Sequence, residues 1–328
     1  MRPLPLVVTF EVNERGRATI AEALGDAADV IYLANAEDSA RPDVLGCAGA
    51  LLARNTAKEL RPDELPLIRK VRLIQFLSAG IDFIPVHELP QEVPVATNGG
   101  AYAEPMAEHA LAMALAAAKR LFVEHQNLLQ GQFNQFTSNK MLAGCICGVF
   151  GFGGVGMATA RIMRCVGMRI HAINHRGATT EPVDWIGTPD RLNELLSASD
   201  VLVISAPLTR LTERAIGARE LLLMKDDAIL VNVARGEIVD EVALYAHLQA
   251  NPRFTACIDA WWVEPVRHGE FRMSQPFLQL PNVIGSPHNS ASAGTSYEVG
   301  LRRATANCRR ALTGETPLHL IRPDERMG

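Results

Sequence analysis

The feature that most constrains the chain is a glycine cluster, Gly151-Phe152-Gly153-Gly154-Val155-Gly156, between an apolar run and a helical pattern. The apolar run ends at Phe150 and predicts a buried strand, and the pattern from Met157 to Val166 predicts a helix. Glycines spaced in this way permit a tight turn, close approach of the backbone to a pyrophosphate and close helix–strand packing. The sequence therefore predicts dinucleotide binding at Gly151, Gly153, Gly154, Val155 and Gly156, whereas a merely tight turn would not need all three glycines.

Apolar runs typical of strands occur on both sides of this loop. They lie at 6–10, 30–33, 50–53 and 73–77 in the first hundred residues, and at 145–150, 169–173, 201–205, 228–233, 255–259 and 283–286 later. Runs without polar alternation suit parallel sheets that helices cover on both faces. With 328 residues, about two domains are expected. The predicted fold class is α/β, with two doubly wound parallel-sheet domains.

An alanine-rich segment from Ala103 to Lys119 joins the two series and predicts a helix that is buried nearly all round. The following segment from Leu121 to Met141 carries Phe122, Phe133 and Phe136 among polar residues and shows no clear strand. Together the helix and this arm would expose much apolar surface in a monomer, so a homodimer is expected.

Composition excludes several classes of protein. Hydrophobic residues make up 48% and charged residues 21%, which is ordinary for a globular chain. The net charge is −4 with no basic block, so no nucleic-acid partner is expected. The six cysteines form no CxxC pair, so no metal site is expected. No signal peptide and no run of eighteen apolar residues stands out, which predicts a cytoplasmic protein without a membrane partner.

The residues after the second predicted strand of the later series bear on cofactor choice. An acidic residue about 20 positions beyond the glycine loop commonly binds the ribose hydroxyls of NAD. Here the chain reads Asn174-His175-Arg176, with no carboxylate and with one guanidinium that suits a 2′-phosphate. We therefore favour NADP over NAD. The alternative is that His175 and Arg176 are solvated loop residues and Asn174 serves NAD.

From the glycine loop onward the chain resembles the D-isomer-specific 2-hydroxyacid dehydrogenases, in particular the glyoxylate/hydroxypyruvate reductases. The resemblance rests on the glycine loop and on the segments 206–209, 232–236, 259–265 and 286–288, with 78–82 and 107–109 upstream. It implies a Rossmann-type cofactor domain, residues 99–291, inserted in a flavodoxin-like substrate domain, residues 1–98 plus 292–328. It also implies that hydride passes between NADP(H) or NAD(H) and a small 2-keto or D-2-hydroxy acid.

The resemblance implies three catalytic residues. Arg235 would bind the substrate carboxylate and polarise the adjacent carbonyl. His288 would act as general acid and base at the carbonyl oxygen. Glu264 would lie beside His288, favour its charged form and select its tautomer.

Further positions follow from the same resemblance. Ser78, Ala79 and Gly80 would bind the substrate carboxylate through backbone N–H groups, and the cofactor would also contact Ala206, Pro207, Val233, Ala234 and Asp259. Asp259 is equally compatible with a cap at a strand end. Arg54 follows a predicted strand and is either a cleft residue or a solvated one.

Two functions are compatible with these residues. The first is an NAD(P)-dependent dehydrogenase that works mainly as a 2-keto acid reductase. The second is a dinucleotide-sensing, corepressor-like binding protein on the same fold, because such relatives can retain all three catalytic residues. Turnover with a panel of 2-keto acids separates the two.

Overall fold

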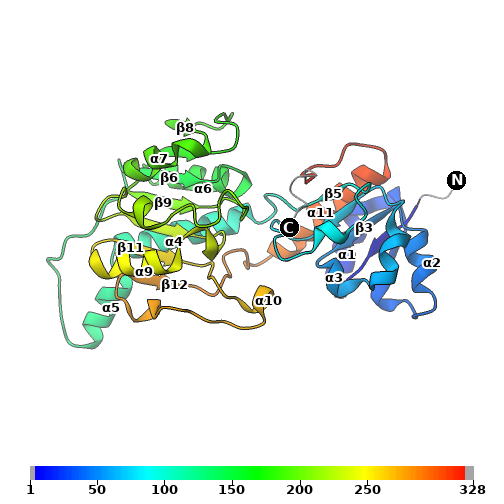
Figure 1. Cartoon of the computed structure of the whole chain (residues 1–328), viewed down its shortest axis with the longest axis horizontal. Helices are drawn as coiled ribbons and strands as arrows, with labels where there is room; N and C mark the ends of the chain where they lie inside the picture. Colours follow the sequence, from blue (N-terminus) through cyan, green and yellow to red (C-terminus); the bar gives the residue numbers. More distant parts are fainter. Residues whose placement is uncertain (1–3, 322–328) are drawn as a thin grey trace. The chain divides into compact units, whose positions relative to one another are not determined.

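The computed structural model describes residues 4–321, and the chain divides into two compact units. Unit 1 takes the chain up to Tyr102 and again from Gly294 onward, and unit 2 takes Ala103–Ala293 (Figure 1). The expected substrate domain, residues 1–98 plus 292–328, includes residues 1–3 and 322–328 at its two ends. These end residues lie outside the described residues. Each unit is built on one parallel sheet, which confirms the predicted fold class.

Unit 1 contains a five-stranded parallel sheet with the order β2-β1-β3-β4-β5. Its strands are β1 (Leu6–Val8), β2 (Val30–Tyr32), β3 (Ala50–Ala53), β4 (Ile74–Phe76) and β5 (Val95–Ala96). Its α-helices are α1 (Glu14–Leu24), α2 (Arg41–Gly46), α3 (Thr56–Glu59) and α11 (Ser296–Leu312). Short 3₁₀ helices are η1 (Gly25–Ala27), η2 (Leu33–Asn35), η3 (Pro62–Ile68) and η4 (Val86–Glu88). This is the flavodoxin-like order, whose topological switch point lies between β1 and β3.

The helices of unit 1 bury both faces of this sheet. The residues of β1 and β3 are fully buried, which explains their unbroken apolar sequence. Helix α1 begins where the side chain of Asn13 accepts a hydrogen bond from the N–H of Gly16, and it ends at Gly25, where φ is 56°. Helix α11 packs against α1 and over β3 and β4 (Figure 1).

The segment after α11 pairs with the sheet of unit 1. Leu320 forms an antiparallel bridge with Ala96, and the N–H of Ile321 donates to the carbonyl of Val95 at 2.9 Å. The amide of the buried Asn307 donates to the carbonyl of Leu318 at 2.9 Å and accepts from its N–H at 2.7 Å. Long-range hydrogen bonds therefore place the tail.

Unit 2 contains a seven-stranded parallel sheet with the order β12-β11-β10-β9-β6-β7-β8. Its strands are β6 (Ile146–Phe150), β7 (Arg169–Ile173), β8 (Trp185–Gly187), β9 (Val201–Ile204), β10 (Ile229–Asn232), β11 (Thr255–Ile258) and β12 (Val283–Gly285). Its α-helices are α4 (Ala103–Ala118), α5 (Leu121–Leu129), α6 (Gly154–Cys165), α7 (Leu192–Ala198), α8 (Ala218–Leu221), α9 (Glu241–Ala250) and α10 (Pro265–His268), with 3₁₀ helices η5 (Pro189–Arg191), η6 (Gly236–Ile238) and η7 (Phe277–Gln279). The order is that of a Rossmann sheet whose switch point lies between β6 and β9.

The expectation that the alanine-rich helix is buried nearly all round is wrong for this chain. One face of α4, with Ala107, Ala110 and Ala114, packs against α6 and the sheet. The other face leaves Glu104, Glu108 and Ala112 exposed. Alanine is compatible with both environments, so composition could not distinguish them. None of the helices between residues 4 and 321 combines the length and apolar character that a membrane span needs.

Candidate active site

The glycine loop lies at the switch point of unit 2, directly after β6. Gly151 has φ of 105°, and a Cβ there would lie 2.2 Å from the backbone nitrogen of Ala206, which follows β9. A Cβ on Gly156 would lie 2.4 Å from the carbonyl oxygen of Gly151. Both positions therefore require glycine, one for the turn and both for close packing.

The start of α6 has room and donors for a pyrophosphate. A Cβ on Gly153 would meet no atom within 4 Å, so the space beside this residue is open. The first turn of the helix closes with the N–H of Met157 donating to the carbonyl of Gly153 at 2.8 Å. The N–H groups of Gly154, Val155 and Gly156 therefore have no intrahelical acceptor, and the helix dipole favours an anion at this end. The loop fits the phosphates of a dinucleotide.

The loop after β7 places Asn174, His175 and Arg176. The amide of Asn174 accepts from the N–H of Arg176 at 3.0 Å and donates to the carbonyl of Ala178 at 2.9 Å, so it stabilises the turn itself. The side chains of His175 and Arg176 are exposed. The guanidinium of Arg176 forms no hydrogen bond or ion pair with any residue in the range 4–321.

The remaining expected cofactor positions follow β9 and β10. The side chains of Ala206, Val233 and Ala234 are buried, and that of Val233 is fully enclosed in the core. Pro207 is exposed. Val233 as a whole residue has no exposed surface.

His288 and Glu264 form a close pair at the other end of the same sheet edge. The Nδ1 atom of His288, after β12, lies 2.8 Å from each carboxylate oxygen of Glu264, after β11. Glu264 is buried, and its Oε1 also accepts from the N–H of Trp261 at 2.7 Å. Burial raises the pKa of the Glu264 carboxyl, but the hydrogen bond and charge of His288, together with the hydrogen bond from the N–H of Trp261, lower it. The charge of Arg235 acts in the same direction, so this pKa lies below its ordinary value and the group is a carboxylate.

Arg235 follows β10. In the strand order, β10 lies between β6, which precedes the glycine loop, and the pair β11 and β12, which precede Glu264 and His288. Arg235 is half-buried, and its Nη1 donates to the carbonyl of Ala234 at 2.8 Å. Its carbonyl accepts from the amide of Asn232 at 2.8 Å, which holds the backbone turn at the strand end. Its charge reaches Glu264, so all three expected catalytic residues lie in one electrostatic environment.

Asp259 holds the loop that carries His288. Its side chain has no exposed surface and accepts from the Oγ of Ser286 at 2.5 Å, the N–H of Asn289 at 3.1 Å and the N–H of Ser290 at 3.2 Å. Its carbonyl accepts from the N–H of His288 at 2.9 Å. These bonds support His288 at φ of 49°, a left-handed conformation that costs free energy for a residue other than glycine. Asp259 therefore acts as a cap at the end of its strand and supports the loop of His288.

Sequence reasoning assigned no role to two residues of this network, His109 and Ser286. The Nε2 of His109, on α4, lies 3.0 Å from the Oγ of Ser286 and 3.7 Å from Oδ1 of Asp259. Ser286 directly follows β12 and precedes Pro287 and His288, a position that could have marked it. His109 lies in the segment 107–109, which contributes to the resemblance, but its partners Asp259 and Ser286 lie 150 and 177 residues later in the chain, so no role could be assigned to it from the sequence.

Ser78, Ala79 and Gly80 lie in unit 1, in the loop after β4, and Arg54 directly follows β3. The hydroxyl of Ser78 is buried and has no hydrogen-bond partner among residues 4–321. Within the same range, no three His, Cys, Asp or Glu side chains are grouped in a way that could hold a metal ion.

Known proteins resemble the chain in sequence and in fold. The family described as "D-isomer specific 2-hydroxyacid dehydrogenase, NAD binding domain" matches residues 111–290. A glyoxylate reductase from Korarchaeum cryptofilum is 31% identical over 265 residues, 77% of this chain and 76% of that protein. A D-3-phosphoglycerate dehydrogenase from Methanocaldococcus jannaschii is 28% identical over 291 residues, 86% of this chain and 54% of that protein. The chain thus spans about half the length of this second relative.

One solved structure extends the likeness in fold to both units. The D-isomer specific 2-hydroxyacid dehydrogenase from Xanthobacter autotrophicus Py2, in complex with NADPH and MES, has a TM-score of 0.79 and 22% identity and covers 99% of each chain. The match to the NAD-binding domain assigns a nicotinamide dinucleotide as the cofactor of unit 2. The chain belongs to the D-isomer specific 2-hydroxyacid dehydrogenase family.

Proposed function

We propose that the chain reduces a small 2-keto acid, similar to glyoxylate or hydroxypyruvate, to the D-2-hydroxy acid with NADPH or NADH. The observation that carries the proposal is the pair formed by His288 and Glu264, 2.8 Å apart at the carboxyl end of the unit 2 sheet. Relatives named glyoxylate reductase and hydroxypyruvate reductase support this substrate class. No observation favours the corepressor-like alternative.

Residues of unit 2 would supply the proton donor for the carbonyl oxygen and the cation that binds the substrate carboxylate. A carboxylate facing Nδ1 keeps a proton on that nitrogen, so the imidazolium presents its second proton at Nε2. His288 would give this proton to the carbonyl oxygen, and Glu264 would stabilise the charged ring before the transfer. Arg235 would hold the substrate carboxylate with two parallel hydrogen bonds. The dinucleotide, when bound, supplies the hydride to the carbonyl carbon.

Unit 1 is proposed to bind the same substrate, and unit 2 the cofactor. The backbone N–H groups of Ser78, Ala79 and Gly80 would donate hydrogen bonds to the carboxylate. The buried hydroxyl of Ser78, which lacks a partner among residues 4–321, would provide one further donor. On this proposal the substrate domain consists of residues 1–98 plus 292–328 and the cofactor domain of residues 99–291.

Absorbance at the nicotinamide band tests the proposal directly. Glyoxylate, hydroxypyruvate and pyruvate are each crossed with NADH and NADPH. We expect turnover with at least one pair, and a loss of about 10²–10⁴-fold in rate in His288→Ala with nearly unchanged cofactor affinity. Cofactor binding without turnover of any 2-keto acid would instead support a binding protein.

We also propose that the enzyme prefers NADP(H). The loop after β7 carries no carboxylate that would repel a 2′-phosphate, and the exposed guanidinium of Arg176 forms no bond with the rest of the described chain. Both sides of the Asn174 amide form hydrogen bonds within the turn, which supports a role for this residue in shaping the loop beside the cofactor.

A homodimer completes the proposal. Large apolar side chains after α4 are exposed, namely Leu121, Phe122, Leu128, Leu129, Phe133, Phe136 and Met141. The first four lie on α5 and the others in the irregular segment that follows. Phe133 is 75% and Phe136 is 90% exposed, which is costly for a monomer in water. A second copy of the chain would cover this surface.

A further inference from the structure

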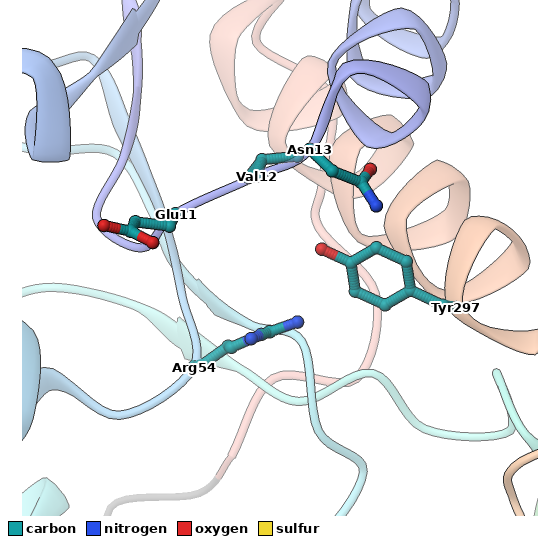
Figure 2. A pocket seen from close by; sticks show the side chains of 5 residues that line it. All are labelled: Glu11, Val12, Asn13, Arg54 and Tyr297. Atoms are coloured by element: carbon teal, nitrogen blue, oxygen red, sulfur yellow. The ribbon is translucent and has the colours of Figure 1, made fainter.

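A histidine and a carboxylate approach each other a second time at the sheet edge of unit 2. The Nε2 atom of His109, on α4, lies 3.7 Å from Oδ1 of Asp259, which directly follows β11. The pocket of unit 1 has a volume of about 480 Å³ and is lined by Glu11, Val12, Asn13, Arg54 and Tyr297. Figure 2 shows the carboxylate of Glu11 directed away from the end of Arg54, so these two charges do not face each other. The pair of His109 and Asp259, in contrast, lies in the same network as His288.

The hydroxyl of Ser286 joins these two side chains and sets the direction of their hydrogen bonds. Its Oγ lies 2.5 Å from Oδ1 of Asp259 and 3.0 Å from Nε2 of His109. A serine hydroxyl has one proton and a carboxylate can only accept, so this proton lies in the bond to Asp259. Toward His109 the hydroxyl oxygen can therefore only accept, and Nε2 must carry a hydrogen. The hydrogen bonds run from His109 through Ser286 to Asp259.

Asp259 connects these hydrogen bonds to the loop of His288. Its carboxylate has no exposed surface, and it also accepts from the N–H of Asn289 at 3.1 Å and from the N–H of Ser290 at 3.2 Å. A buried carboxylate is stable only when donors replace the water that it has lost. Because His109 donates to the oxygen of Ser286, the hydroxyl has one orientation in which both of its bonds form. This orientation keeps the third donor on the carboxylate.

The backbone of His288 depends on the same residue. The N–H of His288 donates to the carbonyl of Asp259 at 2.9 Å, and φ of His288 is 49°. Such a conformation of a residue other than glycine persists only where the surrounding bonds enforce it. We propose that His109 is a positioning residue for His288, because it directs the Ser286 hydroxyl to Asp259 and so holds the loop that presents the proton donor. The inference rests on the proposed function, in which His288 is that donor.

The variants His109→Gln and His109→Asn test the reach of the donor. The amide nitrogen of glutamine can occupy the place of Nε2, whereas that of asparagine reaches only the place of Nδ1. We expect His109→Gln to keep kcat within about twofold of wild type and His109→Asn to lower it about 5- to 20-fold, because the loop of His288 is displaced. In both variants KM for the 2-keto acid and the Kd of NADPH should change by less than about threefold, since no group that binds either molecule is removed. His87→Asn replaces an exposed histidine of unit 1 and should change none of these quantities.

Ser286→Ala shows whether His109 acts through the hydroxyl. If it does, adding His109→Asn to Ser286→Ala should lower kcat no further, because the acceptor of the His109 hydrogen is already absent. The proposal is overturned if the two substitutions multiply their effects in the double variant. It is also overturned if His109→Gln and His109→Asn lose the same activity, since a general effect of the helix surface would not depend on where the amide nitrogen lies.

A proton signal reports the position of His288 without turnover. The hydrogen between Nδ1 of His288 and Glu264 lies in a short bond to a carboxylate. It should give a far-downfield resonance in the proton NMR spectrum of the cofactor-free protein, and Glu264→Gln should remove this resonance. We expect His109→Asn to broaden or weaken the resonance and His109→Gln to retain it.

The same signal distinguishes this proposal from the proposed function. A resonance that depends on His109, without reduction of any 2-keto acid, would refute the proposed function and support the positioning role. Reduction of 2-keto acids with an unchanged resonance and an unchanged kcat in His109→Asn would support the function and refute the positioning role.

Discussion

The imidazole of His288 and the carboxylate of Glu264 meet at 2.8 Å, although 23 residues separate them in the chain and each follows a different strand. Adjacent β11 and β12 bring them together, because the carboxyl ends of parallel strands share one edge of the sheet. Glu264→Gln keeps the shape of the side chain but cannot stabilise the imidazolium by charge. The alkaline limb of the pH–activity profile should therefore move to lower pH, as measured by kcat/KM between pH 5 and 10. An unmoved profile would remove Glu264 from the proton transfer.

Asp259→Asn should separate loop geometry from cofactor binding. The carboxylate of Asp259 accepts hydrogen bonds at both of its oxygens, whereas an amide has only one acceptor oxygen. The amide nitrogen of the variant would therefore face an N–H donor of Asn289 or Ser290. We expect kcat to fall about 10- to 100-fold through displacement of His288, with cofactor affinity little changed. The free energy of unfolding should drop by about 1–3 kcal/mol. Asp226→Asn, at an exposed site of the same unit, serves as the control. A large loss of cofactor affinity would instead indicate direct contact.

Glu64 of unit 1 provides a prediction about stability. This buried carboxylate accepts from Nε of Arg41 at 2.6 Å, from Nη2 of Arg41 at 2.7 Å and from the N–H of Arg61 at 2.8 Å. The hydrogen bond from Arg41 is the main cause that holds the pKa of Glu64 below its ordinary value. Because the pKa is lower in the folded state than in the unfolded state, the resulting stabilisation is complete above the unfolded pKa. It disappears as the pH falls through the folded pKa.

Glu64→Gln should accordingly reduce the free energy of unfolding at pH 7 by about 3–5 kcal/mol, since it leaves the guanidinium of Arg41 without its partner. The difference from wild type should shrink as the pH falls below about 4, near the ordinary pKa of a glutamate. Urea denaturation at both pH values measures this. Glu92→Gln removes an exposed carboxylate and should have little effect at either pH. A difference that does not depend on pH would assign the loss to packing.

Cofactor preference is tested at the loop after β7. Arg176→Ala should weaken NADPH about 10- to 100-fold and barely affect NADH, because a charge-assisted bond to the 2′-phosphate is lost. Asn174→Asp should go further and reverse the preference. Its carboxylate can still accept from the N–H of Arg176, and it adds repulsion against the phosphate. Arg169→Ala, at the opposite end of β7, is the matched control. Equal changes for NADH and NADPH would show that these side chains do not contact the 2′ position.

The proposed dimer is tested by substitutions in the segment from Leu121 to Met141. Leu129→Asp combined with Phe133→Asp places charge in the exposed apolar surface and should yield a species near the 35.7 kDa of one chain in sedimentation equilibrium at micromolar concentration. Leu211→Asp changes a 90% exposed side chain elsewhere in unit 2 and should leave the mass unchanged. A wild type that itself sediments near 35.7 kDa would contradict the dimer.

Much of the fold was predictable because its strands and helices carry strong local patterns. The sequence predicted β3 at 50–53 and β7 at 169–173 with the bounds that the structure shows. It missed β5 and β8, which have two and three residues and lie at sheet edges. Such short edge strands exist because one neighbour provides hydrogen bonds, and no apolar run of their own marks them.

Some features of the site also follow from the sequence, and others depend on the tertiary structure. The sequence by itself determined the glycine loop, because the backbone geometry at Gly151 and Gly156 excludes every larger side chain. It also determined which residues follow the strands, among them Asp259 after β11 and Arg235 after β10. Only the tertiary structure decided that Asp259 supports the loop of His288, that His109 joins Ser286 across the unit, and that two rings hold Arg54. These contacts join residues far apart in the chain, and the order in which the strands pair brings them together.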